Sequence, residues 1–243
     1  MILVGEEVKQ MSVFDFHSHI LPGIDDGSRN IETSINMINK LKESGVEIIV
    51  ATPHFYADKD RVDTFVNNRE VAYEDLMEIY DNDMPKLLLG AEVAFFKGIS
   101  KAEKLSQLLI EGTNAMLLEL PFTKWDESVI NELEYLIHQR KITIILAHLE
   151  RYMGILWNKP YIKKIFEMPV YIQINAESLI DAKRRNSVLK LFKKGQAHLL
   201  GSDCHGMHHR APNLREGRDI IEDKLGREYL DKIDKLGASI LGV

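Results

Sequence analysis

The sequence has a single cysteine, Cys204, among its 243 residues, which excludes an intramolecular disulfide. It has no apolar stretch long enough to span a membrane. Its first residues, MILVGEEVKQ, place two glutamates where a secretory signal peptide needs a basic end and a longer apolar run. We therefore expect a soluble cytoplasmic protein with no membrane insertion.

Acidic residues outnumber basic ones, with 37 Asp and Glu against 31 Lys and Arg and a formal net charge of −6. This balance argues against a nucleic-acid-binding surface. Linkers rich in Pro, Gly or Ser, low-complexity segments and sequence repeats are absent as well. The simplest organisation is one domain over residues 12–243 after an N-terminal extension over 1–11, although the length also permits two smaller domains.

Apolar runs typical of buried strands alternate with helical patterns along the whole chain. The first run begins at Phe14, and the other six cover residues 46–51, 86–91, 115–118, 142–147, 170–174 and 197–202. The intervening spacing predicts helices over about 30–44, 61–80 and 127–139. This alternation indicates an α/β fold of parallel strands joined by right-handed crossovers.

The strand-like runs end in histidines and carboxylates rather than in ordinary turn residues. His17 and His19 are two residues apart on the first strand, so both can reach one point. The other polar groups of this kind are Asp26, His54, Glu92, Glu119, His148, Asp203 and His205. An open doubly wound sheet would gather such groups at one switch point. The pattern therefore favours a seven-stranded TIM-like (β/α) barrel with its active site at the C-terminal mouth.

These nine groups are more than one or two ions need, so three divalent metal ions are expected if a carboxylate bridges. Imidazole and carboxylate without thiolate suit manganese, iron or zinc, and phosphate chemistry favours manganese. Each group also has a structural explanation. The histidines could be hydrogen-bonded or loop residues, Glu92 and Glu119 could be satisfied core carboxylates, and Asp26 could stabilise its Asp-Asp-Gly turn. His138, His198, His208 and His209 lack the strand-end pattern.

Six segments carry a resemblance to a known family. They are HSHILPGIDDG, TPH at 52–54, GAE at 90–92, LLELP at 117–121, AHLERY at 147–152 and SDCH at 202–205. In order and spacing, from Phe14 to Arg210, the chain resembles the CpsB/YwqE-type bacterial protein-tyrosine phosphatases of the polymerase-and-histidinol-phosphatase (PHP) superfamily. The resemblance implies a distorted PHP barrel, a trinuclear and usually manganese centre, and a bacterial tyrosine kinase of a capsular or exopolysaccharide locus as substrate.

The resemblance also implies a role for each matching residue. One ion would lie among His17, His19, Glu92 and Asp203, a second among Glu92, Glu119 and His148, and a third among Asp26, His54 and His205. Arg151 and Arg210 match the two arginines that hold the phosphate. Cys204 departs from the hydrophobic residues of the family at that position and leaves the ligands in place.

From the residues we expect a metal-bridging hydroxide to attack phosphorus in line, without a covalent enzyme intermediate. Every well-placed histidine and carboxylate is assigned to metal, so no general acid remains to protonate a poor leaving group. The site should therefore expel phenolates better than alkoxides and prefer phosphotyrosine. Phe55 and Tyr56, directly after His54, could form an apolar wall for the substrate ring or could be packing residues.

Three other functions stay open at this stage. Cys204 and Arg210 have the C-x5-R spacing of cysteine-dependent phosphatases, although that loop would leave the other polar strand ends without a role. A different PHP phosphoesterase, such as histidinol phosphatase, would use the same metal core. A regulatory phosphotyrosine-binding partner with little turnover would need only the binding groups. The oligomeric state is not predicted.

Overall fold

The computed structural model describes residues 12–243, so the predicted extension over residues 1–11 lies outside the described part of the chain. The strands are Val13–Ser18 (β1), Val46–Ala51 (β2), His54–Phe55 (β3), Lys86–Leu89 (β4), Glu92–Ala94 (β5), Ala115–Glu119 (β6), Thr143–Leu146 (β7), Tyr171–Asn175 (β8) and Leu199–Gly201 (β9). The α-helices are Ile31–Glu43 (α1), Val62–Met77 (α2), Glu127–His138 (α3), Lys159–Glu167 (α4), Ala176–Ile180 (α5), Ala182–Lys193 (α6), Leu214–Leu225 (α7) and Arg227–Leu241 (α8).

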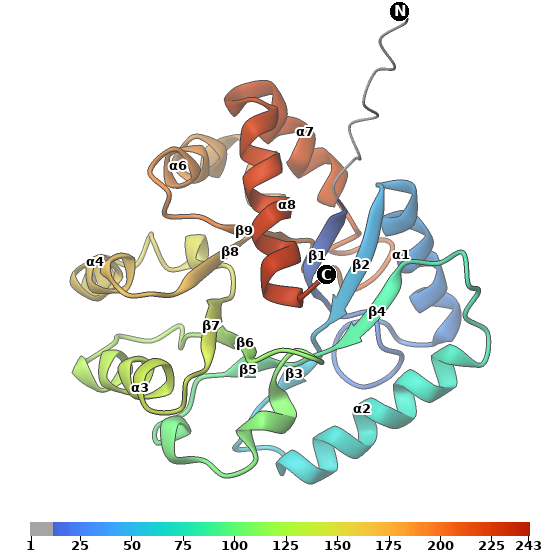
Figure 1. Cartoon of the computed structure of the whole chain (residues 1–243), viewed down its shortest axis with the longest axis horizontal. Coiled ribbons are helices and arrows are strands. Elements are labelled where there is room, and N and C mark those ends of the chain that lie inside the picture. Colours follow the sequence, from blue (N-terminus) through green and yellow to red (C-terminus); the bar gives the residue numbers. More distant parts are fainter. Residues whose placement is uncertain (1–11) are drawn as a thin grey trace, which may run out of the picture.

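All strand pairs are parallel, and the strands curl around the centre of the molecule with the helices outside them (Figure 1). One sheet has the order β1-β2-β4, and the other has the order β3-β5-β6-β7-β8-β9. The α/β class predicted from the sequence is confirmed. None of the helices formed by residues 12–243 is long and apolar enough to cross a membrane.

The prediction of seven strands is wrong in number because two short strands follow the predicted runs 46–51 and 86–91. Strand β2 ends at Ala51 and β3 begins at His54, while β4 ends at Leu89 and β5 begins at Glu92. Pro53 has no N–H to donate to a ladder, so it separates β3 from β2. The two short continuations pair with each other and start the second sheet, which sets His54 opposite Glu92.

The first and last strands lie side by side and bring their C-terminal ends together. The backbone N–H of Asp203 donates to His17 O at 2.7 Å, and that of His19 donates to Cys204 O at 3.0 Å. This approach requires Gly201, because a Cβ there would lie 2.6 Å from His17 Cβ. The polar residues after β1 and β9 therefore meet at one place.

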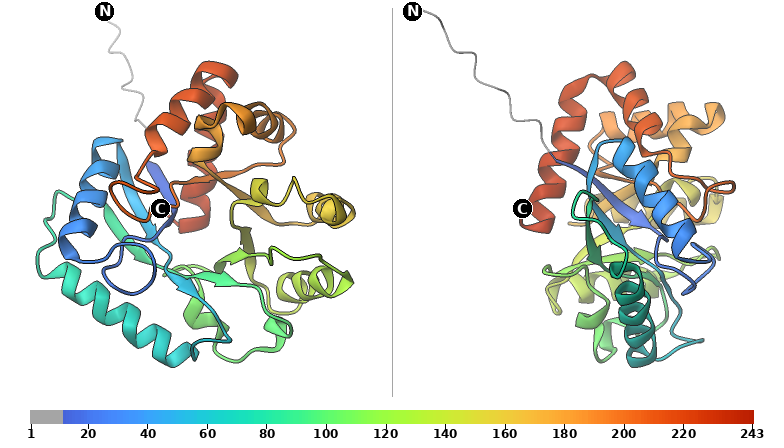
Figure 2. Two further views of the ribbon diagram at one scale, coloured as in Figure 1. Left: turned by 180° about the vertical axis from the view of Figure 1, so that it is seen from behind. Right: turned by 90° about the vertical axis from the view of Figure 1, so that its right-hand side faces the viewer.

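Alternate strand residues pack on the two faces of the curled sheet, as the two-residue period of a strand requires. The cluster on one face takes its strand residues from β1, β2, β4, β6, β7 and β9, and it includes Phe14, Phe16, Val50, Leu117, Ile145 and Leu199. Leu241, from the last turn of α8, belongs to the same cluster, so α8 covers one side of it (Figure 2). The larger cluster lies between the opposite face and the surrounding helices.

The predicted helix boundaries hold where the sequence has clear signals. The side chain of Asn30 accepts a hydrogen bond from Thr33 N at 2.9 Å, which fixes the start of α1. Gly45 follows its end with φ +80°, a conformation that favours glycine. Asp126 caps α3 in the same way, through Ser128 N at 2.8 Å.

Candidate metal centre

The nine predicted ligands converge at the C-terminal ends of the strands. Ligand-capable side chains of residues 12–243 form four groups whose donor atoms lie within 4.8 Å of one another. The groups are His19, Asp26, His54 and His205; His17, His19 and Glu92; His17, His148 and Asp203; and His54, Glu92 and Glu119. His138, His198, His208 and His209 belong to none of these groups.

Glu92, the first residue of β5, lies at the centre of the cluster and touches four imidazoles. Its Oε2 lies 3.1 Å from His17 Nε2, 3.3 Å from His19 Nε2 and 2.9 Å from His54 Nδ1. Its Oε1 lies 2.8 Å from His148 Nε2. A carboxylate whose two oxygens face different imidazoles has the geometry that a bridging ligand requires.

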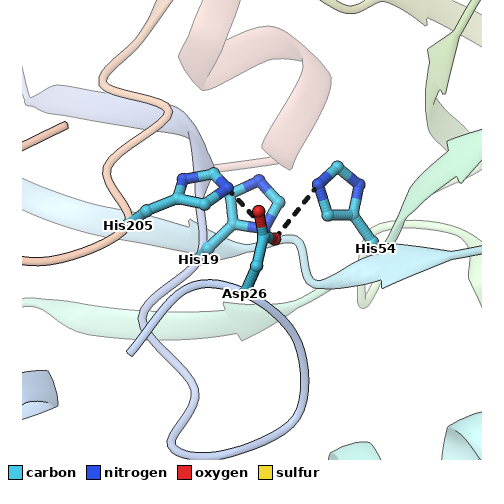
Figure 3. A group of neighbouring side chains, drawn as sticks. All are labelled: His19, Asp26, His54 and His205. Carbon is cyan, nitrogen blue, oxygen red and sulfur yellow. Dashed lines mark ion pairs between the residues drawn. The ribbon is translucent and has the colours of Figure 1, made fainter. Parts of the chain in front are cut away.

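Asp26 joins the cluster from the loop after β1. Its Oδ1 lies 3.5 Å from His54 Nε2 and 3.4 Å from His205 Nε2, so the carboxylate sits between the two rings (Figure 3). The neighbouring Gly27 allows this loop to fold back, since a Cβ there would lie 2.3 Å from His19 O. The side chain of Asp26 is 68% exposed, so this part of the cluster opens to solvent.

Several buried polar atoms of the cluster have close neighbours but no well-formed hydrogen bond. Glu92 Oε2, Asp203 Oδ1 and His54 Nδ1 are buried, and among residues 12–243 their contacts within the cluster do not have hydrogen-bond geometry. Leaving such atoms unsatisfied is costly. Lone pairs of oxygen and nitrogen that converge on shared points suit divalent cations, so this donor set fits the predicted metal ions.

The ionisation of the cluster indicates the same need for positive charge. Burial alone would raise the pKa of Glu92, but the nearby His17, His148 and His19 outweigh it and hold this pKa well below its usual value. Burial together with the Glu92 carboxylate raises the pKa of Glu119 to about 7. The carboxylates therefore depend on cationic neighbours to stay ionised together.

The backbone is strained where the site is assembled. His148, Asp203 and Arg210 have φ values of 33°, 51° and 52°, in the left-handed region that residues with a Cβ rarely adopt. Only two other non-glycine residues between 12 and 243 do so. Strained conformations persist where the surrounding structure enforces them, and functional sites are a common place for them.

Two residues that hold the histidines in place are not among those predicted from the sequence. Asp25 Oδ2 lies 2.7 Å from His19 Nδ1, and Gln173 Oε1 lies 3.1 Å from His17 Nδ1. Such partners fix the ring orientation and leave the other nitrogen free for a metal. The available signals were the second carboxylate of the Asp-Asp-Gly turn and a glutamine within an apolar strand run.

Arg151 and Arg210 both reach the same edge of the cluster. Arg151 Nη2 donates to Asp203 Oδ2 at 2.6 Å, and Arg210 Nη2 pairs with the same oxygen. Arg210 Nη1 also lies 2.8 Å from His205 Nε2. The arginine side chains are 25% and 24% exposed, so both can be reached from solvent.

The predicted aromatic wall is wrong for Phe55. Its side chain is 2% exposed and packs edge-on against Phe65, with ring centroids 5.2 Å apart, because it points to the side of β3 opposite to His54. Tyr56 does face the opening, where it lines a cavity of about 440 Å³ with Asp26, His54 and other residues.

Cys204 cannot serve as a nucleophile in this arrangement. Its side chain is fully buried in the larger apolar cluster. Burial raises the pKa of the Cys204 thiol, with the nearby Asp15 adding to the effect, whereas a catalytic thiolate needs a lowered pKa and access to substrate. Arg210, the arginine of the C-x5-R spacing, pairs with Asp203 instead.

Comparison with known proteins identifies close relatives over nearly the whole chain. The family described as capsular polysaccharide synthesis, CpsB/CapC, matches residues 13–239. The tyrosine-protein phosphatase CpsB of Streptococcus agalactiae is 28% identical over 237 residues, which cover 91% of this chain and 94% of that protein. The tyrosine-protein phosphatase YwqE of Bacillus subtilis is 27% identical over 221 residues, covering 89% and 86%.

Solved structures show the same fold. A structure from the work on YwqE of Bacillus subtilis and CpsB of Streptococcus pneumoniae, described as unique metal-dependent tyrosine phosphatases, has a TM-score of 0.82 and 23% identity, and covers 95% of this chain and 94% of that one. The phosphotriesterase homology protein of Escherichia coli, with phosphate in its active site, has a TM-score of 0.57 and 13% identity, and covers 95% and 99%.

Proposed function

This chain belongs to the CpsB/CapC family, and we propose from that premise that it is a metal-dependent protein-tyrosine phosphatase, a phosphoric monoester hydrolase. The observation that carries the proposal is the convergence of imidazoles and carboxylates around Glu92, with two arginines at the edge of the same cluster. With divalent cations bound, this solvent-accessible site would carry a net positive charge and would suit a phosphate dianion.

The ligands are proposed to hold three divalent cations, manganese before iron or zinc. His17, His19, Glu92 and Asp203 would hold one ion, Glu92, Glu119 and His148 a second, and Asp26, His54 and His205 a third. When bound, the cations supply Lewis acidity toward the phosphate oxygens and lower the pKa of coordinated water. Asp25 and Gln173 keep the rings of His19 and His17 turned toward that site.

Arg151 and Arg210 are proposed to bind the phosphate group. Their guanidinium groups cannot ligate a cation, yet both lie within reach of ligand side chains. They share one oxygen of Asp203, so each has other N–H groups free to donate to phosphate oxygens. These donors would stabilise the charge on the equatorial oxygens during transfer of the phosphoryl group.

The remaining expectations are proposals of the same kind. The curled sheet would be the distorted barrel of the PHP superfamily, and residues 12–243 would form one domain after an extension over 1–11. The substrate would be a phosphorylated bacterial tyrosine kinase of a polysaccharide locus, because the matching family is one of capsular polysaccharide synthesis. The protein would act in the cytoplasm.

The test is a pair of peptides that differ only in phosphotyrosine or phosphoserine, assayed with manganese at one pH. Every histidine and carboxylate of the four ligand groups is assigned to metal, so none of them is left to protonate a serine alkoxide, whereas a phenolate leaves unaided. We expect kcat/KM to be at least about 10²-fold higher for phosphotyrosine, in line with the size of general acid catalysis. Equal kcat/KM values for the two peptides would favour an alkyl phosphate such as histidinol phosphate as the substrate. Binding of the phosphotyrosine peptide without turnover would indicate a regulatory partner.

A further inference from the structure

Phe122 places a half-exposed aromatic ring beside the candidate metal centre. It follows β6, three residues after Glu119, and its side chain is 54% exposed. Its ring lies nearly parallel to two others, with centroids 4.8 Å from Tyr152 and 6.2 Å from His148 and interplanar angles of 21° and 22°. The ring therefore stacks mainly on Tyr152, lies near the predicted metal ligand His148, and stays about half exposed to solvent.

The loop that carries Phe122 is held firmly. Three side chains fix its backbone carbonyls: Tyr152 Oη donates to Leu120 O, Trp125 Nε1 donates to Pro121 O at 2.7 Å, and Asn158 Nδ2 donates to Thr123 O at 3.1 Å. Trp125 and Tyr152 are themselves buried. Phe122 is thus exposed on a loop that is fixed by hydrogen bonds. An exposed ring lacks the hydrophobic stabilisation that burial would provide.

The other aromatic residues near the site are less suited to contact a substrate ring. Phe55 is buried. The ring of Tyr56 packs against His54, with centroids 5.1 Å apart, and Lys59 Nζ lies 4.0 Å from its centroid. Phe122 lies next to His148 and offers an open aromatic surface that neither of these residues has.

We infer that Phe122 forms the wall against which the phenyl ring of phosphotyrosine packs, an inference that rests on the proposed phosphatase function. In an aryl phosphate a single oxygen joins the ring to phosphorus, so the ring lies immediately outside the phosphate position. His148, whose ring centroid lies 6.2 Å from that of Phe122, is a proposed ligand that contacts Glu92 at the centre of the cluster. Stacked or edge-to-face contact between the two rings would then add affinity for aryl esters alone.

The test measures binding of phenylphosphonate and methylphosphonate, which differ only in the ring, to the manganese-loaded protein by calorimetry. We expect Phe122→Ala to weaken phenylphosphonate binding by about 2- to 10-fold, the size of an aromatic pair, and to leave methylphosphonate binding unchanged. KM for a phosphotyrosine peptide should rise by the same factor. Phe122→Tyr should behave as the parent protein, and Tyr135→Ala, which removes a 43% exposed ring on α3, is the matched control.

The outcomes separate this inference from the proposed function. Equal weakening of both phosphonates in Phe122→Ala, or a loss of bound manganese, would mean that Phe122 only supports His148, and would overturn the inference while leaving the phosphatase assignment intact. Unchanged binding of both would overturn it in the same way. If the parent protein binds neither phosphonate and hydrolyses no phosphotyrosine peptide, the proposed function fails and the inference fails with it.

Discussion

Two buried charged clusters of this protein differ in whether the chain itself completes them. Arg218 of α7 and Asp234 of α8 form a bidentate pair, with Nη1–Oδ1 at 2.7 Å and Nη2–Oδ2 at 2.8 Å, so both carboxylate oxygens have donors. In the candidate metal centre, Glu92 Oε2 and Asp203 Oδ1 are equally buried, and among residues 12–243 they face imidazole nitrogens without a well-formed hydrogen bond. The first cluster is a finished structural contact, whereas the second is a set of donor atoms that suits cations.

The difference follows from the residue types and the backbone that presents them. A guanidinium supplies a fixed positive charge and several N–H donors, so one arginine can satisfy one carboxylate. A neutral imidazole offers one N–H and one lone pair, so once the N–H has a partner the lone pair can bind a cation together with a neighbouring carboxylate. The arginine pair lies on regular helices, whereas His148 and Asp203 hold left-handed φ values of 33° and 51°. Strain and unpaired atoms thus mark the functional cluster.

The largest expected effect is the loss of activity when Glu92, the central carboxylate of the candidate metal centre, is replaced. Glu92→Gln removes a negative charge that four imidazoles surround, so we expect kcat/KM for an aryl phosphate to fall on the order of 10⁴-fold, or roughly 5.5 kcal/mol. A strong chelator should abolish activity in the parent protein, and manganese should restore it. Metal analysis of both proteins provides the control. Full activity in a verified metal-free sample would mean that the candidate metal centre works without cations, so it would no longer differ from the Arg218–Asp234 pair in this respect.

The second effect is on stability and should leave the chemistry alone. Asp234→Ala leaves the guanidinium of Arg218 without its ionic partner, and Arg218 is only 7% exposed. The free energy of unfolding should therefore fall by about 3–5 kcal/mol. Urea unfolding measures this change, and kcat/KM per folded molecule should stay constant. The double variant Arg218→Met with Asp234→Leu removes both charges and should recover most of the stability. If the double variant were as unstable as the single one, the pair would contribute more than charge compensation.

The sequence indicates eight of the nine candidate ligands because they lie at the ends of strand-like runs, where a charged or imidazole side chain is unexpected. The ninth, Asp26, lies in an Asp-Asp-Gly turn, and its assignment depends on the family resemblance. The roles of Asp25, Gln173 and Phe122 depend on which residues they meet in space, and local pattern does not contain that information. The seven runs were placed correctly, but the breaks after Ala51 and Leu89 depend on how the two sheets separate.

The wrong assignment of Phe55 has a simple physical cause. Nearness in sequence to His54 suggested that both Phe55 and Tyr56 face the site, yet successive strand residues point to opposite faces. His54 faces Glu92, so Phe55 must face the apolar cluster, where it packs against Phe65. The choice between Phe55 and Tyr56 could have been made from the two-residue period alone. The role of Phe122 could not have been predicted from the local sequence, because Tyr152, from a later part of the chain, positions its ring.

The smallest effect is expected at Cys204, which belongs to neither cluster although it lies between Asp203 and His205. Its side chain is fully buried and packs in the apolar core, and only its backbone O contacts the site region, by accepting from His19 N at 3.0 Å. Cys204→Ser keeps that backbone and nearly the same volume, so kcat/KM with manganese should change by no more than about twofold, or roughly 0.4 kcal/mol. The buried hydroxyl should lower the free energy of unfolding by about 1–3 kcal/mol, which urea unfolding detects. Thiol alkylation of the folded parent protein should be slow because the Cys204 side chain is buried.

A loss of activity beyond about 10²-fold in Cys204→Ser, with manganese content and folding intact, would instead identify the thiol as the nucleophile. Only a residue that acts on substrate produces a loss of that size without disturbing the ligands.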